Sequence, residues 1–299
     1  MHDDHDHDDY GADDFDADGF DADVTERFRG RKVRRPQGRA RLRDVADDDA
    51  TDPGLARLRE IGLLHDVVGE LKSGKEADVL LARGPDGLLA LKVYRDPDAG
   101  GYRPDAVYLD GRRVPRGRLK KVLDRGARSG LPPELALWVL HEASTLWAFE
   151  KAGVPVPTPL VGPGAYEIAQ TGRVLPMAFI GDPDGTPAPR LADVALTHAD
   201  AADAWRQAQD LAVTLLRSGW VHGDLSAWNL LRHDGRLVVI DVPQAVRVDE
   251  SPHAAALFSR DVHSLLHSVA GLGIEDDPVR LEAELRTRAG LPPTGPFPF

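Results

Sequence analysis

The sequence of 299 residues contains no cysteine, which excludes disulfide bonds, thiolate metal sites and cysteine nucleophiles. It also has no apolar run long enough to cross a membrane, and its acidic N-terminus is unlike a secretory signal peptide. We therefore expect no membrane contact and a cytoplasmic location. The formal net charge of −12 argues against nucleic-acid binding by the chain as a whole.

The charge is distributed very unevenly over residues 1–50, which we predict to be a disordered tail. Its first part, up to about Asp23, is dense in aspartate and has too few apolar groups to offset the entropy of ordering. Three interleaved histidines could bind a metal loosely, but a solvated acidic tail is the simpler interpretation: His2, His5 and His7. Residues 27–43 are arginine-rich, and this basic arm could contact RNA phosphates or fold back on the acidic tail.

Residues 51–181 are predicted to form a first domain that contains a small antiparallel sheet. Leucine and isoleucine repeat at helical spacing from Leu55 to Leu64, which predicts a short amphipathic helix. Two apolar strands flank a polar turn in residues 66–81, and a third strand follows in residues 88–94. Residues 96–130 are rich in Gly, Arg, Lys and Pro, so we expect a flexible insertion there.

Lys92 stands inside the otherwise apolar third strand, where its ammonium needs a partner. Apolar residues repeat at helical spacing from Pro133 until Gly153, and Glu142 lies near the middle of this predicted helix. Glu134 and Glu150 are nearer the helix ends, so Glu142 is the preferred partner. The alternative is an edge-strand lysine that reaches water.

Two further segments of this domain could contact a nucleotide. The turn Ser73-Gly74-Lys75 could cover phosphates with backbone amides and one cation, although it could equally be an ordinary turn. Residues 174–181 read as a strand that ends in a glycine, a hinge whose backbone could meet an adenine. The domain boundary is therefore drawn at about Gly181.

Residues 182–299 are predicted to form a second, mainly helical domain, with helices at about 199–218, 261–269 and 278–289. Within it Asp224 is followed five residues later by Asn229, and an apolar strand ends abruptly at Asp241. A turn at Asp234-Gly235 predicts a hairpin that brings these three side chains to one edge. Phosphoryl transfer needs one carboxylate for the attacking hydroxyl and oxygen ligands for magnesium.

Taken together, the motifs resemble the RIO family of atypical serine protein kinases, in consistent order from about Leu55 to Leu272. The motifs that carry the resemblance are Ser73-Gly74-Lys75-Glu76, Lys92-Val93-Tyr94, the tryptophan-containing helix with Glu142, Met177-Ala178-Phe179-Ile180-Gly181, His222-Gly223-Asp224 with Asn229, and Asp241-Val242-Pro243-Gln244.

The resemblance implies an α+β, protein-kinase-like fold of two lobes, a small antiparallel sheet and a helical lobe, without a long activation loop. It implies ATP and Mg²⁺ or Mn²⁺ as cofactors and an unknown protein substrate. The residue roles that it implies are Asp224 as catalytic acid/base, Asn229 and Asp241 as metal ligands, Lys92 and Glu142 as phosphate-orienting pair, Ser73, Gly74 and Lys75 along the triphosphate, and Met177, Ala178 and Ile180 around the adenine.

Departures from ordinary protein kinases leave three functions open. His222-Gly223-Asp224 offers no arginine to receive an activation-loop phosphate, and fewer than about 60 residues follow Asp241. The first function is a serine protein kinase that can autophosphorylate. The second is an ATPase-switched assembly factor that contacts RNA or the ribosome through residues 27–43. The third is a small-molecule phosphotransferase of the aminoglycoside-kinase type.

Overall fold

The structure is a computed structural model that describes residues 52–95 and 132–298, which belong to one compact unit of the chain. The predicted tail 1–50, with its basic arm 27–43, and the predicted insertion 96–130 lie outside the described residues. Within the described part of the chain, no helix combines the length and the apolar character that crossing a membrane requires.

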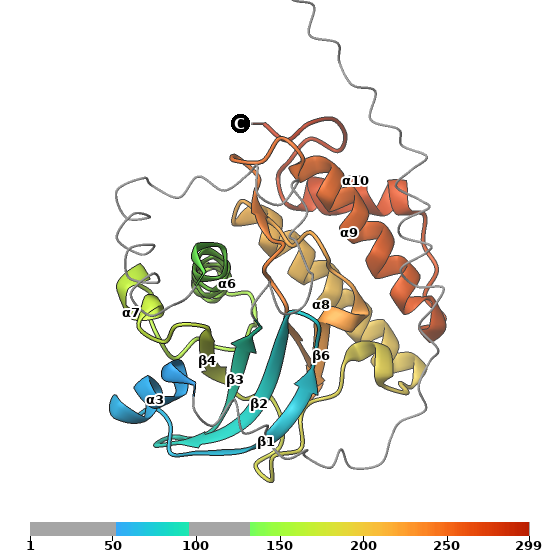
Figure 1. The fold of residues 1–299 in the computed structure, drawn as a ribbon. Coiled ribbons are helices and arrows are strands. Elements are labelled where there is room, and N and C mark those ends of the chain that lie inside the picture. Colours follow the sequence, from blue (N-terminus) through green and yellow to red (C-terminus); the bar gives the residue numbers. More distant parts are fainter. Residues whose placement is uncertain (1–51, 96–131, 299) are drawn as a thin grey trace, which may run out of the picture. The chain divides into compact units, whose positions relative to one another are not determined.

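The first half of the fold is built around a four-stranded antiparallel sheet in the order β1-β2-β3-β4 (Figure 1). Its strands are β1 (Asp66–Ser73), β2 (Ala77–Gly84), β3 (Gly87–Tyr94) and β4 (Val174–Ala178). Leu80, Leu91 and Leu175 are at most 1% exposed, so adjacent strands contribute to one continuous core.

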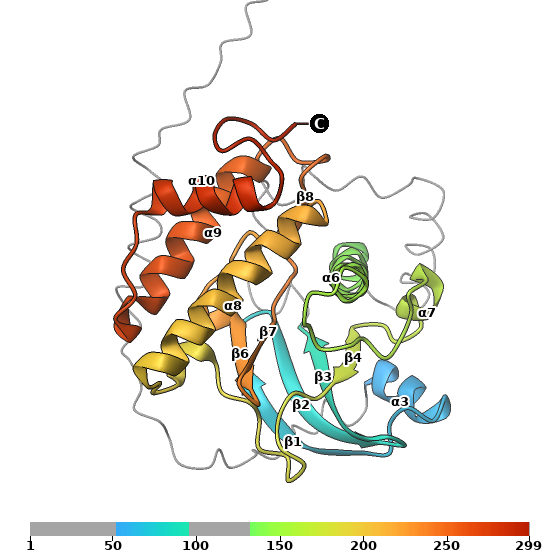
Figure 2. The ribbon, with the colours of Figure 1, turned by 180° about the vertical axis from the view of Figure 1, so that it is seen from behind.

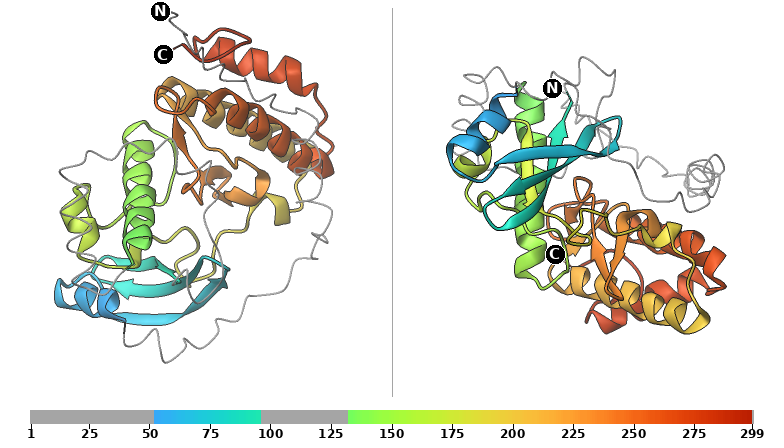
Figure 3. Two further views of the ribbon diagram at one scale, coloured as in Figure 1. Left: turned by 45° about the horizontal axis from the view of Figure 1, so that its top comes forward. Right: turned by 90° about the horizontal axis from the view of Figure 1, so that it is seen from below.

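Three helices accompany this sheet: α3 (Pro53–Glu60), α6 (Pro133–Lys151) and α7 (Ala165–Ala169). Asp52 caps α3 by accepting hydrogen bonds from the Gly54 and Leu55 amides. Helix α6 contacts both α7 and β4, and Figure 3 shows it beside the sheet. It ends just before Gly153, whose φ of +78° favours glycine, so the predicted end of the helix is confirmed.

β4 is shorter than the strand expected over residues 174–181. It ends at Ala178 because the following chain pairs locally, with Gly181 in an isolated bridge to Pro187. The Asp182 amide also donates to the Thr186 carbonyl at 2.8 Å. This local loop satisfies backbone groups that a longer β4 would have used.

The second half consists of three longer helices and two small antiparallel pairs of strands. The helices are α8 (His198–Arg217), α9 (Ala254–Val269) and α10 (Pro278–Arg288), with short 3₁₀ turns η2 (Leu191–Asp193), η3 (Ala227–Asn229) and η4 (Ala270–Leu272). The paired strands are β5 (Trp220–Val221) with β8 (Val246–Arg247), and β6 (Leu230–His233) with β7 (Arg236–Val239). Helix α10 contacts both α8 and α9 (Figure 2). The antiparallel sheet and this helical half confirm the predicted α+β fold class.

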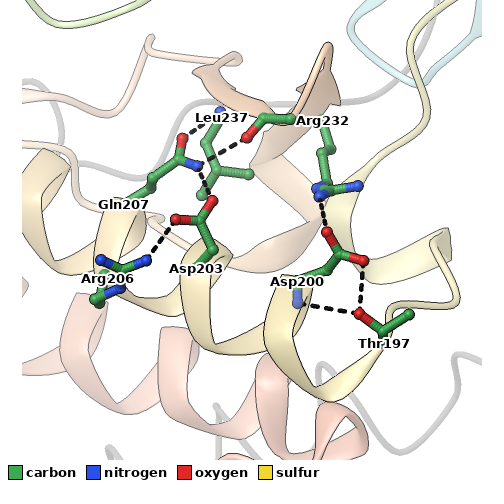
Figure 4. A network of polar contacts seen from close by, with 8 residues as sticks. Thr197, Asp200, Asp203, Arg206, Gln207, Arg232 and Leu237 are labelled. Carbon is green, nitrogen blue, oxygen red and sulfur yellow. Dashed lines mark hydrogen bonds and ion pairs between the residues drawn. The ribbon is translucent and has the colours of Figure 1, made fainter.

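The β6–β7 hairpin has the predicted Asp-Gly turn, with φ of +48° at Asp234 and +74° at Gly235. The side chain of Gln207 attaches this hairpin to α8 (Figure 4). Its amide nitrogen donates to the Gly235 carbonyl at 2.8 Å and to Asp203 at 2.7 Å, while its oxygen accepts from the Leu237 amide at 2.9 Å. One glutamine thus provides hydrogen-bond partners for two backbone groups of the hairpin.

The start of α8 contacts the other strand of the hairpin. Thr197 caps the helix by accepting from the Asp200 amide, and its hydroxyl donates to the Asp200 carboxylate at 2.7 Å (Figure 4). Arg232 on β6 donates to the same carboxylate at 3.0 Å. Both strands of the hairpin are therefore anchored to one helix.

Candidate active site

The side chain of Lys92 is the centre of the candidate site, where β3, α6 and the segment after β7 meet. Its Nζ lies 2.7 Å and 2.8 Å from the two oxygens of Glu142 and 3.1 Å from Oδ1 of Asp241. The ion pair with Glu142 is therefore formed, and the side chains of Lys92 and Glu142 are 12% and 3% exposed. The alternative of a lysine that reaches water is not what the structure shows.

Burial and charge act in opposite directions on this cluster. Burial by itself would lower the pKa of Lys92, but the carboxylates of Glu142 and Asp241 raise it above its ordinary value. Burial raises the pKa of Glu142, against the lowering effect of the Lys92 ammonium. That ammonium lowers the pKa of Asp241. Lys92 therefore stays protonated and Asp241 stays ionised at neutral pH.

Asp241 follows β7 in an unusual backbone conformation, with φ of +63°. This left-handed region is uncommon for residues other than glycine and occurs frequently at functional sites. The Ile240 amide donates to the Asn229 carbonyl at 2.9 Å, which ties the segments on either side of the hairpin together. The hairpin thus brings the ends that carry Asn229 and Asp241 to one edge, as the sequence predicted.

Asp224 lies in the loop between β5 and η3, where Asn229 contacts it directly. The Asn229 side-chain amide donates to the Asp224 backbone carbonyl at 2.9 Å and to its carboxylate at 3.1 Å. Gly223, immediately before Asp224, has φ of +77°, and a Cβ there would lie 2.7 Å from the Gln244 carbonyl oxygen. Only glycine fits this position without displacement of the loop.

Helix α9 holds this loop through side chains that the sequence analysis did not assign to the site. Asp261 accepts hydrogen bonds from the Gly223 and Leu225 amides, both at 2.8 Å, and Arg260 donates to the Gly223 carbonyl. Burial raises the pKa of Asp261 to about 7, against the lowering effect of the two amide donors. The sequence could have indicated that Asp261 is buried, because helical spacing puts this acid on the same face as three buried apolar residues: Leu257, Phe258 and Leu265.

His222 is fully buried at the entrance to the loop, and its Nδ1 accepts from the Asp224 amide at 3.3 Å. Burial lowers the pKa of His222, partly offset by the charges of Asp224 and Asp241. The imidazole is therefore neutral at pH 7 and acts as a structural acceptor for the loop backbone.

The predicted phosphate-covering residues form the turn between β1 and β2. Gly74 closes this turn, since its amide donates to the Ala77 carbonyl at 3.0 Å, and Ser73 and Lys75 are exposed. Arg95, just after β3, donates to the Ser73 hydroxyl at 2.7 Å and forms an ion pair with Asp78. No local sequence pattern predicted that Arg95 would be a neighbour of this turn.

The predicted adenine-contacting residues lie at and beyond the end of β4. Met177 is 9% exposed and opposite Ala90 in the β3–β4 register. The Ala178 amide donates to the Thr158 carbonyl at 2.8 Å, and the Ile180 carbonyl accepts from Ala188 at 3.0 Å. Adenine recognition by Ala178 and Ile180 would therefore have to use the remaining groups, the Ala178 carbonyl and the Ile180 amide.

A cavity of about 500 Å³ lies next to these residues, between the β2–β3 turn and the segment that follows β4. Its lining includes His65, Asp66, Arg83, Phe179 and Asp182. Phe179 and Gly181 of the predicted hinge line it, but none of the residues given a specific nucleotide or metal role does. We therefore assign the candidate site from the side-chain cluster around Lys92 and from the Asp224 loop.

The residues present fit a magnesium ion bound together with phosphate oxygens. Asp241 is an ionised carboxylate and Asn229 a neutral amide, and both supply the hard oxygen ligands that magnesium prefers. In the described ranges no cluster of three or more His, Asp or Glu side chains could hold a metal alone. Such a site suits a metal that keeps waters and shares its coordination with a substrate.

The antiparallel sheet with its buried lysine–glutamate pair, together with the Asp224 loop, is typical of protein-kinase-like folds. A family model described as the RIO domain matches residues 121–278. The RIO-type serine/threonine-protein kinase Rio1 of Haloferax volcanii is 34% identical over 232 residues, which cover 77% of this chain and 72% of the relative. The chain belongs to the RIO family, and the predicted family membership is confirmed.

Other similar proteins are longer than this chain. The serine/threonine-protein kinase RIO1 of Caenorhabditis elegans is 32% identical over 246 residues, which cover 79% of this chain but only 45% of the relative. A solved structure of the Rio2 kinase of Chaetomium thermophilum, in an ADP/Mg²⁺-phosphoaspartate complex, covers 82% of this chain and 62% of that one. Its identity is 20% and its TM-score is 0.48.

Proposed function

We propose that the protein is an ATP- and magnesium-dependent serine protein kinase of RIO type that can phosphorylate itself. The observation that carries the proposal is that the Lys92 ammonium contacts both Glu142 and Asp241 at hydrogen-bond distances. Membership of the RIO family supports the proposal, and so does the fact that the relatives described above are named serine/threonine-protein kinases. A cytoplasmic location, and lobes that meet at about Gly181, are part of the same proposal.

In this proposal each residue has one physical task. Lys92, oriented by Glu142, binds the α- and β-phosphates, and Asp224 orients the attacking serine hydroxyl and accepts its proton. Asn229 and Asp241 would hold magnesium, whose charge offsets that of the phosphate oxygens. Ser73, Gly74 and Lys75 would cover the triphosphate, while Met177, Ala178 and Ile180 would border the adenine.

The test is mass spectrometry of the purified protein after incubation with ATP and magnesium, comparing wild type with Asp224→Ala. We expect phosphate on a serine of the wild type and none on the variant, while ATP binding is retained. Asp210→Ala, a change at an exposed carboxylate of α8, serves as the matched control and should behave like wild type. Absence of any phosphate on the wild type, or equal phosphate on Asp224→Ala, would contradict the proposal.

A second candidate function is an ATPase-switched assembly factor that binds RNA or the ribosome. The short segment between Asp241 and α9, which runs from Val242 to His253, favours this function. Part of the segment forms β8, which pairs with β5. That leaves little chain for docking a peptide substrate. Release of inorganic phosphate without labelled protein, and without transfer to an added aminoglycoside, would favour the switch. Deletion of residues 27–43 should then flatten the salt dependence of RNA binding.

A further inference from the structure

Tyr94 completes the cluster around Lys92, and none of the roles proposed above involves it. It is the last residue of β3, two positions after Lys92, so both side chains emerge on the same face of the strand. Tyr94 is 1% exposed, and its hydroxyl donates a hydrogen bond to Oε2 of Glu142. Lys92 Nζ lies 5.3 Å from the centre of the tyrosine ring, within the range of a cation–π contact.

The hydroxyl changes how firmly Glu142 is held. Lys92 is a single flexible cation that contacts both carboxylate oxygens, at 2.7 Å and 2.8 Å, and so restrains rotation of the carboxylate only weakly. Tyr94 adds a donor on one oxygen from a rigid, buried ring. A buried carboxylate needs all its available donors, because each missing hydrogen bond leaves charge uncompensated.

A second acceptor competes for the same ammonium. Asp241 Oδ1 lies 3.1 Å from Lys92 Nζ, and its side chain is 44% exposed, against 3% for Glu142. Any movement of Glu142 away from β3 would leave Lys92 to pair with Asp241 alone. In that arrangement the ammonium would cover the proposed metal ligand instead of facing the phosphates.

We propose that Tyr94 is a positioning residue, which fixes Glu142 so that Lys92 is presented to the nucleotide phosphates rather than drawn to Asp241. This inference rests on the proposed function. Tyr94 itself touches neither the nucleotide nor the metal in this assignment. Its effect is transmitted through Glu142, and that route is what an experiment can isolate.

The test is Tyr94→Phe, which removes the hydroxyl and keeps the ring, its packing and its contact with Lys92. We expect the KM for ATP to rise about tenfold, the effect of losing one hydrogen bond to a charged group, with kcat lowered less than threefold. Tyr166→Phe removes a hydroxyl from an exposed tyrosine, 55% accessible, and should leave both constants unchanged. Thermal unfolding of each variant identifies any loss of folded protein.

A double-mutant cycle with Glu142→Gln separates positioning from a general packing role. If Tyr94 acts through Glu142, Tyr94→Phe should raise KM little further in the Glu142→Gln background. Additive effects of the two substitutions on KM, or a wild-type KM for the Tyr94→Phe variant, would overturn the inference about Tyr94. The proposed function would still stand in either case, provided that the wild-type protein is active. A wild-type protein that neither binds ATP nor transfers phosphate would overturn both.

Discussion

Gln207 lies outside the candidate site but should determine how well the edge that carries the proposed metal ligands is held. Its side chain makes three hydrogen bonds, to Gly235, Leu237 and Asp203, all between 2.7 and 2.9 Å. Gln207→Met keeps the length of the side chain and removes all three. At a net of about 1 kcal/mol for each bond, the expected loss of unfolding free energy is about 3 kcal/mol. For a domain of this size, Tm should fall by roughly 5–10 °C.

Urea unfolding and thermal scans measure this loss, with Gln209→Met as the matched control. Gln209 is on the same helix and is also half-buried, and among the described residues its side chain makes one hydrogen bond, which it accepts from Arg288 at 3.2 Å. In the proposed reaction, Gln207→Met should also raise the magnesium concentration needed for half-maximal activity, because the hairpin connects Asn229 to Asp241. Equal unfolding midpoints for the two variants would refute the reasoning.

Three further predictions concern single positions. Gly223→Ala should destabilise the fold by more than the roughly 1–2 kcal/mol cost of a left-handed residue, because its Cβ would lie 2.7 Å from the Gln244 carbonyl. Gly235→Ala, at φ +74° and with no atom of the described residues within 4 Å of the added Cβ, should cost only that strain in urea unfolding. Because burial lowers the pKa of His222, the folded state binds fewer protons at this residue than the unfolded chain, so the contribution of His222 to stability should fall as pH drops below 6.5. The difference in unfolding free energy between wild type and His222→Gln, followed over that range, should show this loss, and a flat difference would contradict it. Phe149→Ala, at a side chain with 0% exposure, should lose about 3–5 kcal/mol of unfolding free energy, and a loss below about 1 kcal/mol would contradict its core position.

The contacts that could be predicted from sequence are those in which a local pattern implies a partner. A lysine in an apolar strand requires a charge, and Glu142 was the central acid of the next helix. An Asp-Gly pair between apolar segments indicates a two-residue turn, and Asp234 and Gly235 have the positive φ that it needs. These patterns were sufficient to predict the β6–β7 hairpin and the ion pair of Lys92.

Other contacts could not be predicted because their partners are backbone groups far away in the chain. Asp261 binds amides 38 and 36 residues before it, and no sequence periodicity identifies a backbone donor. The two-residue strands β5 and β8 are too short to show an alternating pattern, and the 3.1 Å contact of Lys92 with Asp241 depends on how sheet and hairpin pack. Such contacts require the tertiary structure.

The two carboxylates on Lys92 differ in exposure, and under the proposed function this difference would let one ammonium serve both a resting and a ligand-bound state. The contact with Glu142 is almost completely buried, so breaking it would leave an uncompensated charge and cost several kcal/mol. Asp241 is 44% exposed, and an ion pair that water reaches contributes only about 0–1 kcal/mol. In the proposed reaction, an arriving phosphate would therefore replace Asp241 at low cost while Lys92 stays bound to Glu142, and the released carboxylate would be free to hold the proposed metal.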